Sequence, residues 1–227
     1  MRARIAICIV LAALMTACAG LGLSRSAKNE FEEGLRLYNA GEYAQAVPRF
    51  QKATQEEPEY AEAFLYLGRA YLNQGKWSQA LPPLRTAWRL SPDETRDQVL
   101  DVLMDALIGA GTSAFETGNY TEALGYLREG LRTAPQDSAA WTAATEQMLN
   151  FGGQLLSKGN FTEAITLYRS LLEAAPGAQA SLSAYLGLAK AYLQNGQFLD
   201  ALRAATAATN VDPALNDPRQ LLDSLRE

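Results

Sequence analysis

Gly118-Asn119-Tyr120-Thr121-Glu122-Ala123 is a six-residue stretch that returns almost unchanged at 159–164 as Gly-Asn-Phe-Thr-Glu-Ala. The shared pattern is glycine, any residue, an aromatic residue, two further residues and alanine. The chain carries five copies of it, which begin at Gly41, Gly75, Gly118, Gly159 and Gly196. A pattern that recurs along a chain in this way predicts stacked structural units, each of which buries its apolar face against the next.

Three further positions recur at fixed distances from these five turn glycines. A small residue stands seven places before each of them: Gly34, Gly68, Gly111, Gly152 and Ala189. Nine places after stand Phe50, Leu84, Leu127, Tyr168 and Ala205, and seventeen places after stand Pro58, Pro92, Pro135, Pro176 and Pro213. We expect the turn glycine to end one helix in a left-handed conformation, the aromatic to open the next, and the small residues to let the two helices cross closely. The prolines fit the end of the second helix.

These positions resemble the tetratricopeptide repeat (TPR), a pair of antiparallel helices with a period of ~34 residues. The resemblance implies an all-α solenoid of five helix-turn-helix repeats over residues 28–213, closed by a short capping helix in 214–227. We place the repeats at about 28–58, 61–92, 93–135, 138–176 and 181–213.

The turn glycines are 34, 43, 41 and 37 residues apart, so three of the repeats carry extra residues. We expect the first insertion to lengthen the helix that starts near Asp93, and the second to start a helix near Ser138. The third should lie in a loop over 174–181. Ser91 is expected to cap the long helix, with Glu94 as its capping-box partner.

The first seventeen residues form a secretory signal in our interpretation. Arg2 and Arg4 precede an apolar run over residues 5–15, which is too short to cross a bilayer comfortably. The residues up to Cys18 resemble the bacterial lipobox, which implies cleavage before Cys18 and a covalent lipid on that cysteine. The alternative is an ordinary secreted protein in which Cys18 merely lies near the cleavage point.

Ala19 follows the cysteine, and the resemblance then implies sorting to the periplasmic side of the outer membrane rather than retention at the inner membrane. Residues 18–27 are expected to form a lipidated flexible tether. We expect the lipid to be the only membrane contact, because no later stretch looks apolar enough to span a bilayer.

Composition argues against catalysis and against nucleic-acid binding. The chain has 227 residues, a net charge of −5 and no histidine, which removes the commonest general base and a common zinc ligand. The chain has no cluster of basic residues that could bind the phosphate backbone of a nucleic acid. We therefore expect no enzyme activity, no metal site and no cofactor besides the lipid on Cys18.

The candidate partner-binding groove is formed by the first helix of each repeat, as the resemblance implies. Positions ten and three before each turn glycine are seven residues apart and share one helical face. All ten are apolar: Phe31, Tyr38, Leu65, Leu72, Ile108, Phe115, Leu149, Leu156, Leu186 and Leu193. Arg69 and Lys190, six places before their glycines, add two cations. The competing interpretation is that these rows are ordinary repeat core or are covered by the terminal helix.

These features favour a scaffold that helps to assemble or position an envelope complex, loosely similar to TPR lipoproteins of type IV pilus and secretin assembly. The expected partners are envelope proteins such as a secretin or a β-barrel. Alternatives are an adaptor for cell-wall enzymes or polysaccharide export, a component of β-barrel assembly, and a homodimer stacked through the groove or terminal helix. An envelope enzyme or small-ligand binder is the rival class, and a polar pocket dense in functional groups would favour it.

Overall fold

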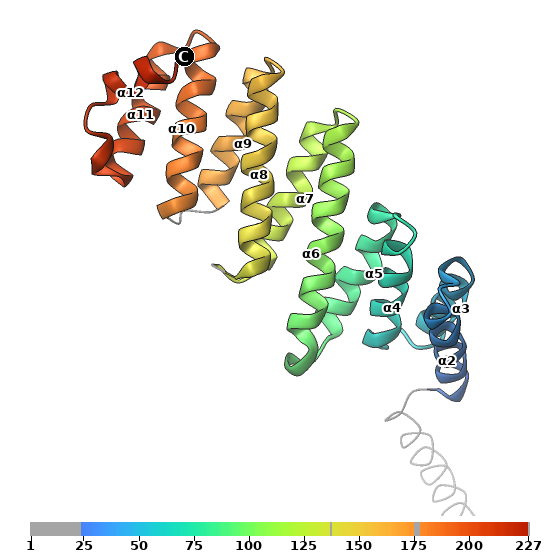
Figure 1. Cartoon of the computed structure of the whole chain (residues 1–227). Coiled ribbons are helices and arrows are strands. Elements are labelled where there is room, and N and C mark those ends of the chain that lie inside the picture. The colour runs from blue at the N-terminus through green and yellow to red at the C-terminus, as the bar shows by residue number, and fades with distance from the viewer. Residues whose placement is uncertain (1–23, 137, 175–177, 227) are drawn as a thin grey trace, which may run out of the picture. The chain divides into compact units, whose positions relative to one another are not determined.

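The computed structural model describes residues 24–136, 138–174 and 178–226. Across these residues the chain folds into α-helices and no strand, which confirms the predicted all-α solenoid (Figure 1). The α-helices are α2 (Arg25–Asn39), α3 (Tyr43–Glu56), α4 (Ala61–Leu72), α5 (Trp77–Leu90), α6 (Asp93–Glu116), α7 (Tyr120–Thr133), α8 (Ala139–Ser157), α9 (Phe161–Ala174), α10 (Ala178–Gln194), α11 (Phe198–Val211) and α12 (Pro218–Ser224). A short 3-10 helix, Pro213–Leu215, precedes α12.

The predicted turn chemistry is confirmed in all five helix pairs. Each turn glycine has a positive φ between 68° and 80°, the region that only glycine enters without a steric penalty. Each repeat aromatic is the first residue of the second helix of its pair. These aromatics are Tyr43, Trp77, Tyr120, Phe161 and Phe198.

The small residue before each turn allows the two helices of a pair to touch. A methyl group added at Gly34 would lie 2.7 Å from Phe50 Cε1, and one at Gly111 would lie 3.4 Å from Leu127 Cγ. The fifth pair instead carries Ala189 and Ala205, both fully buried. A methyl on the first helix is thus accompanied by a smaller side chain on the second, as a fixed helix separation requires.

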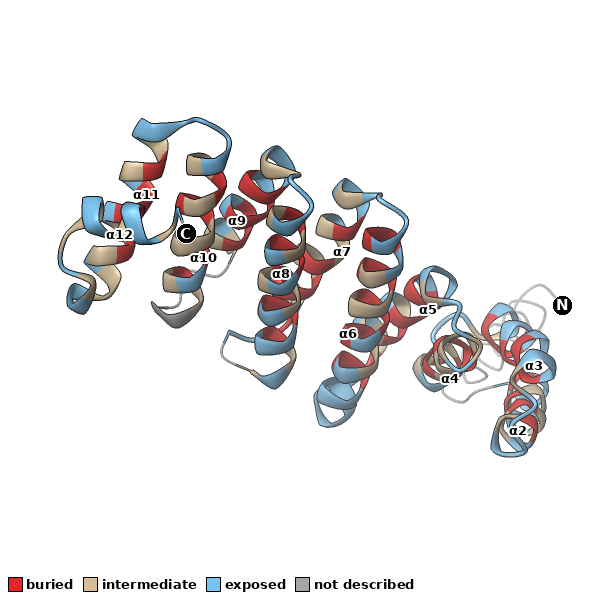
Figure 2. Cartoon of the chain, turned by 45° about the horizontal axis from the view of Figure 1, so that its top comes forward, coloured by how far each residue is buried: buried red, intermediate tan, exposed pale blue. Residues whose placement is uncertain are grey.

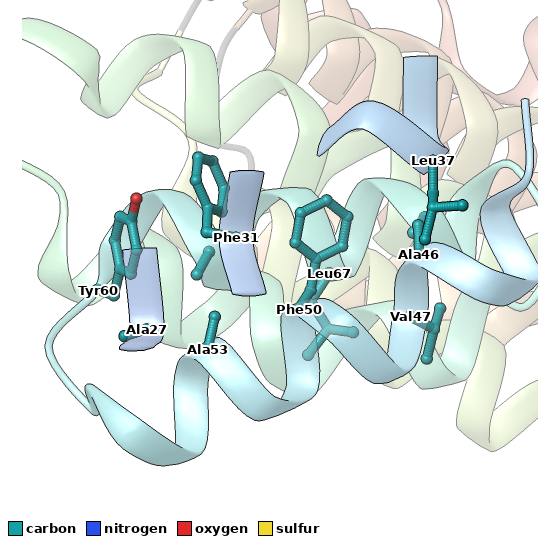
Figure 3. Close-up of a cluster of buried hydrophobic side chains, with 11 residues drawn as sticks. Ala27, Phe31, Leu37, Ala46, Val47, Phe50, Ala53, Tyr60 and Leu67 are labelled. Carbon is teal, nitrogen blue, oxygen red and sulfur yellow. The ribbon is translucent and has the colours of Figure 1, made fainter. Parts of the chain in front are cut away.

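The chain divides into two compact units, residues 1–76 with 82–91 and residues 77–81 with 92–227. In unit 1, the helices α2, α3 and α4 enclose an apolar cluster (Figure 3). Phe31, Phe50 and Tyr60 are at most 8% exposed there. Phe31 lies 5.7 Å from Phe50 and 4.9 Å from Tyr60 between ring centroids, so one aromatic from α2 joins the other two helices.

In unit 2, α6, α8 and α10 are the first helices of successive pairs, and α7, α9 and α11 are the second helices. Figure 2 shows that α6 and α8 carry buried residues on the sides turned to their neighbours and exposed residues elsewhere. α6 has 24 residues and begins at Asp93, as expected. α8 begins directly after Ser138, whose hydroxyl accepts a hydrogen bond from the Trp141 amide at 3.1 Å and caps the helix.

Several boundaries differ from the sequence prediction. Ser91 does not cap α6, because its hydroxyl is buried and donates to the Ala87 carbonyl of the preceding helix at 2.7 Å. The residue before α6 is Pro92, and no side chain caps this helix. α10 starts at Ala178, so part of the expected loop over 174–181 is helical.

The expected tether over 18–27 is also too long. α2 starts at Arg25, and Ser24 caps it by accepting from the Ala27 amide at 3.1 Å. Ala27 is fully buried in unit 1, which explains why the chain is ordered into the helix there. The signal at 1–17 and Cys18 lie outside the described residues.

We expected no stretch after Cys18 to be apolar enough to span a membrane, and by length and composition alone this expectation is wrong. Among the described residues, α6 alone is long and apolar enough to span a bilayer, with a mean hydropathy of 1.2 in its most apolar stretch. In the fold, 56% of that stretch is buried within the protein. A core helix passes the same test of length and composition, because it must be apolar on more than one side.

Candidate partner-binding surfaces

The first-helix face is the surface of each unit formed by the first helices of its pairs, on the side away from the second helices. It is made by α2 and α4 in unit 1 and by α6, α8 and α10 in unit 2. The predicted groove residues divide there into core and surface. Phe31, Leu65 and Phe115 are 5%, 7% and 3% exposed, so for these three the prediction of a groove lining is wrong.

The two aromatic residues among these three are covered by rings from neighbouring parts of the chain. Besides its contacts with Phe50 and Tyr60, Phe31 meets the edge of Tyr66 at 5.6 Å between centroids. Phe115 stacks on Phe151 of α8, with ring centroids 3.9 Å apart and planes 7° apart. Both rings therefore connect successive helices and do not line an open groove on the first-helix face.

In unit 1, the remaining predicted residues Tyr38, Arg69 and Leu72 are half-buried. The Tyr38 hydroxyl accepts a hydrogen bond from Asn73 Nδ2 at 3.0 Å, and burial raises the pKa of this hydroxyl. The Arg69 guanidinium lies 5.4 Å from the Tyr66 ring centroid, within the range of a cation–π contact. This face is therefore largely occupied by its own aromatic contacts.

In unit 2, the remaining predicted residues are half-buried, like those of unit 1, and together form the unit 2 row. They are Ile108, Leu149, Leu156, Leu186, Lys190 and Leu193. Gln147 of α8 donates to the Thr112 hydroxyl of α6 at 3.4 Å and links the two helices beside this row. Five apolar side chains thus keep part of their surface in water, and one cation accompanies them.

Sequence reasoning missed a hollow on the other side of unit 2, between the second helices α7 and α9. Its volume is about 230 Å³. The floor is Phe115, Phe151 and Leu155, and Tyr120 and Thr166 stand at its walls. The available signal was the near identity of 118–123 and 159–164, since the two copies supply much of this lining.

Two buried tyrosines and the exposed Asp105 also have a raised pKa, and these groups lie apart in the sequence. Burial raises the pKa of Tyr60 and of Tyr168 to about 12, so both remain protonated at neutral pH. The pKa of Asp105 is also raised, first by burial and then by the nearby Asp101. Among the described residues, His, Cys, Asp and Glu side chains form no group of three or more that could hold a metal.

The fold and its surfaces define a helical-repeat binding protein, and comparison with known families agrees. Tetratricopeptide repeat family models match residues 31–95, 104–144 and 155–222, which together are most of the chain. The chain belongs to the tetratricopeptide repeat family. Proteins of this family mediate protein–protein interactions, their fold is typically a non-enzymatic scaffold, and neither matching model describes a catalytic family.

Solved structures with the same fold include a TPR repeats protein, BF2334, from Bacteroides fragilis NCTC 9343. It is 16% identical, with 89% of this chain and 99% of that chain covered and a TM-score of 0.62. MamA is 18% identical over 83% of this chain and 92% of its own, with a TM-score of 0.40.

YrrB, described as a TPR protein with an unusual peptide-binding site, is 19% identical over 87% of this chain and 90% of its own. Its TM-score is 0.37. The TM-scores of MamA and YrrB are too low for an argument about sites, and the likeness to the Bacteroides protein supports the fold alone.

Proposed function

We propose that this protein is a binding scaffold, held at the periplasmic side of the outer membrane by a lipid on Cys18, that helps to assemble or position an envelope complex such as a pilus or secretin system. The observation that supports binding is the unit 2 row of apolar side chains on α6, α8 and α10, which are only partly buried. Apolar residues gathered on one face of a soluble domain mark interaction sites. The residues around Cys18 support the anchor.

The segment received by this row is apolar or amphipathic, because the row offers five apolar residues and a single cation. The apolar face of a partner helix presents side chains at intervals of three and four residues. A partly exposed row can bury those side chains without unfolding the scaffold. An envelope protein such as a secretin or a β-barrel supplies the partner in this proposal.

In-cell photo-crosslinking tests the binding surface. A photoreactive amino acid is placed at Leu149 or Leu186 of the full chain, and at the exposed Thr206 of α11 as the control. We expect one envelope protein to crosslink from both row positions and not from Thr206, with its identity read by mass spectrometry. Equal labelling from Thr206, or crosslinks only to residues of the same chain, would contradict the proposal. Crosslinks only to a second copy would show that the row is a dimer interface.

Substitution of the two cysteines tests the anchor separately. With Cys18→Ser in the full chain, we expect loss of radiolabelled palmitate incorporation and release from the membrane fraction. Cys8→Ser is the matched control, because residue 8 belongs to the expected signal and should leave both properties intact. Continued lipid labelling of the Cys18→Ser protein would show that the anchor lies elsewhere.

A further inference from the structure

We propose that the hollow between α7 and α9 is a second binding site, which accepts one large apolar side chain flanked by lysine or arginine from a partner protein. The hollow is lined mainly by residues of the second helices α7 and α9, whereas the unit 2 row lies on the first helices α6, α8 and α10. The two surfaces share no residue, so this proposal does not depend on the function proposed for the row.

The size and lining of the hollow suit a ring or a branched aliphatic side chain. Its volume of about 230 Å³ exceeds the ~150 Å³ of an engineered apolar cavity that binds benzene. Phe115, Phe151 and Leu155 at the floor are each at most 3% exposed, and they present carbon atoms only. An apolar side chain that enters the hollow loses its contact with water and gains contacts with this floor.

The hollow exists because the repeat aromatic at this junction does not fill it. At the preceding junction of unit 2, the indole of Trp77 packs directly against Gly109 of α6. The residue that corresponds to Trp77 here is Tyr120, whose ring is smaller. Its hydroxyl accepts a hydrogen bond at 3.2 Å from Asn160, in the turn before α9, and this bond holds the ring at the side of the hollow.

The rim of the hollow is acidic, and this selects the flanking residues of the partner. Glu163 lines the hollow, and Glu122 lies beside it in an adjoining depression that Glu163 shares. No lysine or arginine lines either of these. Glu122 accepts from the Tyr126 hydroxyl at 2.8 Å, and no residue of the described chain forms an ion pair with Glu163. Two carboxylates at an apolar opening attract a partner that carries positive charge next to its apolar residue.

Two cations lie near the hollow without lining it. The Lys158 ammonium lies 5.2 Å from the Phe115 ring centroid but does not line the hollow. Arg169 lines a neighbouring depression together with Asp200, and this depression shares Thr162 and Thr166 with the hollow. Among the residues that line the hollow and its adjoining depression, the charged side chains are Glu122 and Glu163, and an uncharged acyl chain would gain nothing from them.

Two short peptides test the site on the full chain. One is acetyl-Gly-Lys-(4-fluorophenylalanine)-Lys-Gly-amide, and the other has glutamate in place of both lysines. We expect the fluorine resonance of the lysine peptide to shift on titration, because aromatic rings line the hollow. We expect its dissociation constant to be at least about fivefold below that of the glutamate peptide, as for a few exposed charge pairs.

Matched variants separate the hollow from the rest of the surface. Glu163→Lys should weaken binding of the lysine peptide about fivefold, since it replaces an attraction by a repulsion. Glu173→Lys, at the exposed end of the same helix, should leave it unchanged. Thr166→Phe places a ring at the wall of the hollow and should abolish the fluorine shift, whereas Thr142→Phe on the exposed surface of α8 should not.

Three results overturn the proposal. The first is the absence of any fluorine shift with the lysine peptide. The second is equal binding of both peptides. It would show that the hollow selects its ligand by apolarity alone, as it would an acyl chain. The third is an equal effect of Glu163→Lys and Glu173→Lys, which places the peptide away from the hollow.

Discussion

At the residue scale, the glycines inside the helices differ in what surrounds them. Gly152 and Gly153 are adjacent in α8, yet a methyl at Gly152 would come closer than 3.0 Å to the Tyr168 ring, whereas one at Gly153 meets nothing within 4 Å. The Tyr168 ring cannot move aside, because Gly187 of α10 lies just as close to it. Two glycines on different helices thus make room for one buried aromatic.

Substitution of these neighbouring glycines should therefore have opposite effects. Gly152→Ala should lower the free energy of unfolding by about 1–3 kcal/mol, as overpacking of a core does. Gly153→Ala should raise it by up to about 1 kcal/mol, since alanine is the better helix former and the site is open. Urea denaturation followed by circular dichroism measures both. A stabilised Gly152→Ala protein would show that the Tyr168 ring is free to move.

At the element scale, ion pairs connect α2 and α3 in unit 1. The Glu30 carboxylate of α2 accepts from Lys52 and from Arg49 of α3, the latter at 3.1 Å, and its side chain is 13% exposed. The hydrogen bonds from Lys52 and then Arg49 lower the pKa of Glu30 below its ordinary 4.5. A carboxylate whose pKa is lowered by folding stabilises the folded state above pH 4.5, and that stabilisation is lost as the pH falls through the lowered value.

Glu30→Gln should accordingly destabilise the protein in a pH-dependent way. At pH 7 we expect a loss of at most about 1 kcal/mol, in keeping with partly exposed ion pairs. The difference from the unsubstituted protein should shrink as the pH falls below 4.5 and the carboxylate takes up its proton. Thermal unfolding from pH 7 to pH 3 measures this, with the exposed Glu59→Gln as the control. A difference that stays constant with pH would assign the effect to packing.

At the scale of the whole molecule, a stack of repeats is stabilised between neighbours, so a change at one end should remain local. α12 packs against α11 and α10, and its Leu222 is only 1% exposed. Phe198 and Leu199 at the start of α11 remain 48% and 71% exposed. The end of the solenoid is therefore only partly covered.

Leu222→Ala should loosen the last repeat and leave unit 1 unaffected. Loss of a buried leucine costs about 2 kcal/mol or more. We expect faster amide hydrogen exchange in α10 and α11 and unchanged exchange in α2 to α4, measured by mass spectrometry. Leu225→Ala, at a half-exposed position of the same segment, is the control. Faster exchange throughout the chain would instead indicate that the whole protein unfolds as one unit.

The repeat pattern by itself determined the helix pairs, the left-handed turns at the five glycines, and the close helix crossing at Gly34 and its counterparts. These features follow from neighbours in sequence, because a turn needs a particular φ and a helix crossing needs a small residue. The boundaries of α2 and α10 were less well predicted. The serine cap at Ser24 is a local signal for the start of α2 that the sequence prediction missed, and the burial of Ala27 follows only from the tertiary structure.

Only the tertiary structure decided which apolar residues reach the surface. Phe115 and Leu149 occupy the same helical face in the pattern, but Phe115 is buried against Phe151 and Leu149 is half-exposed. The hollow between α7 and α9 is likewise set by distant contacts, since the hydroxyl of Tyr120 beside it is held by Asn160. Helical periodicity places a side chain on a face, whereas its exposure depends on packing against residues more than thirty positions away.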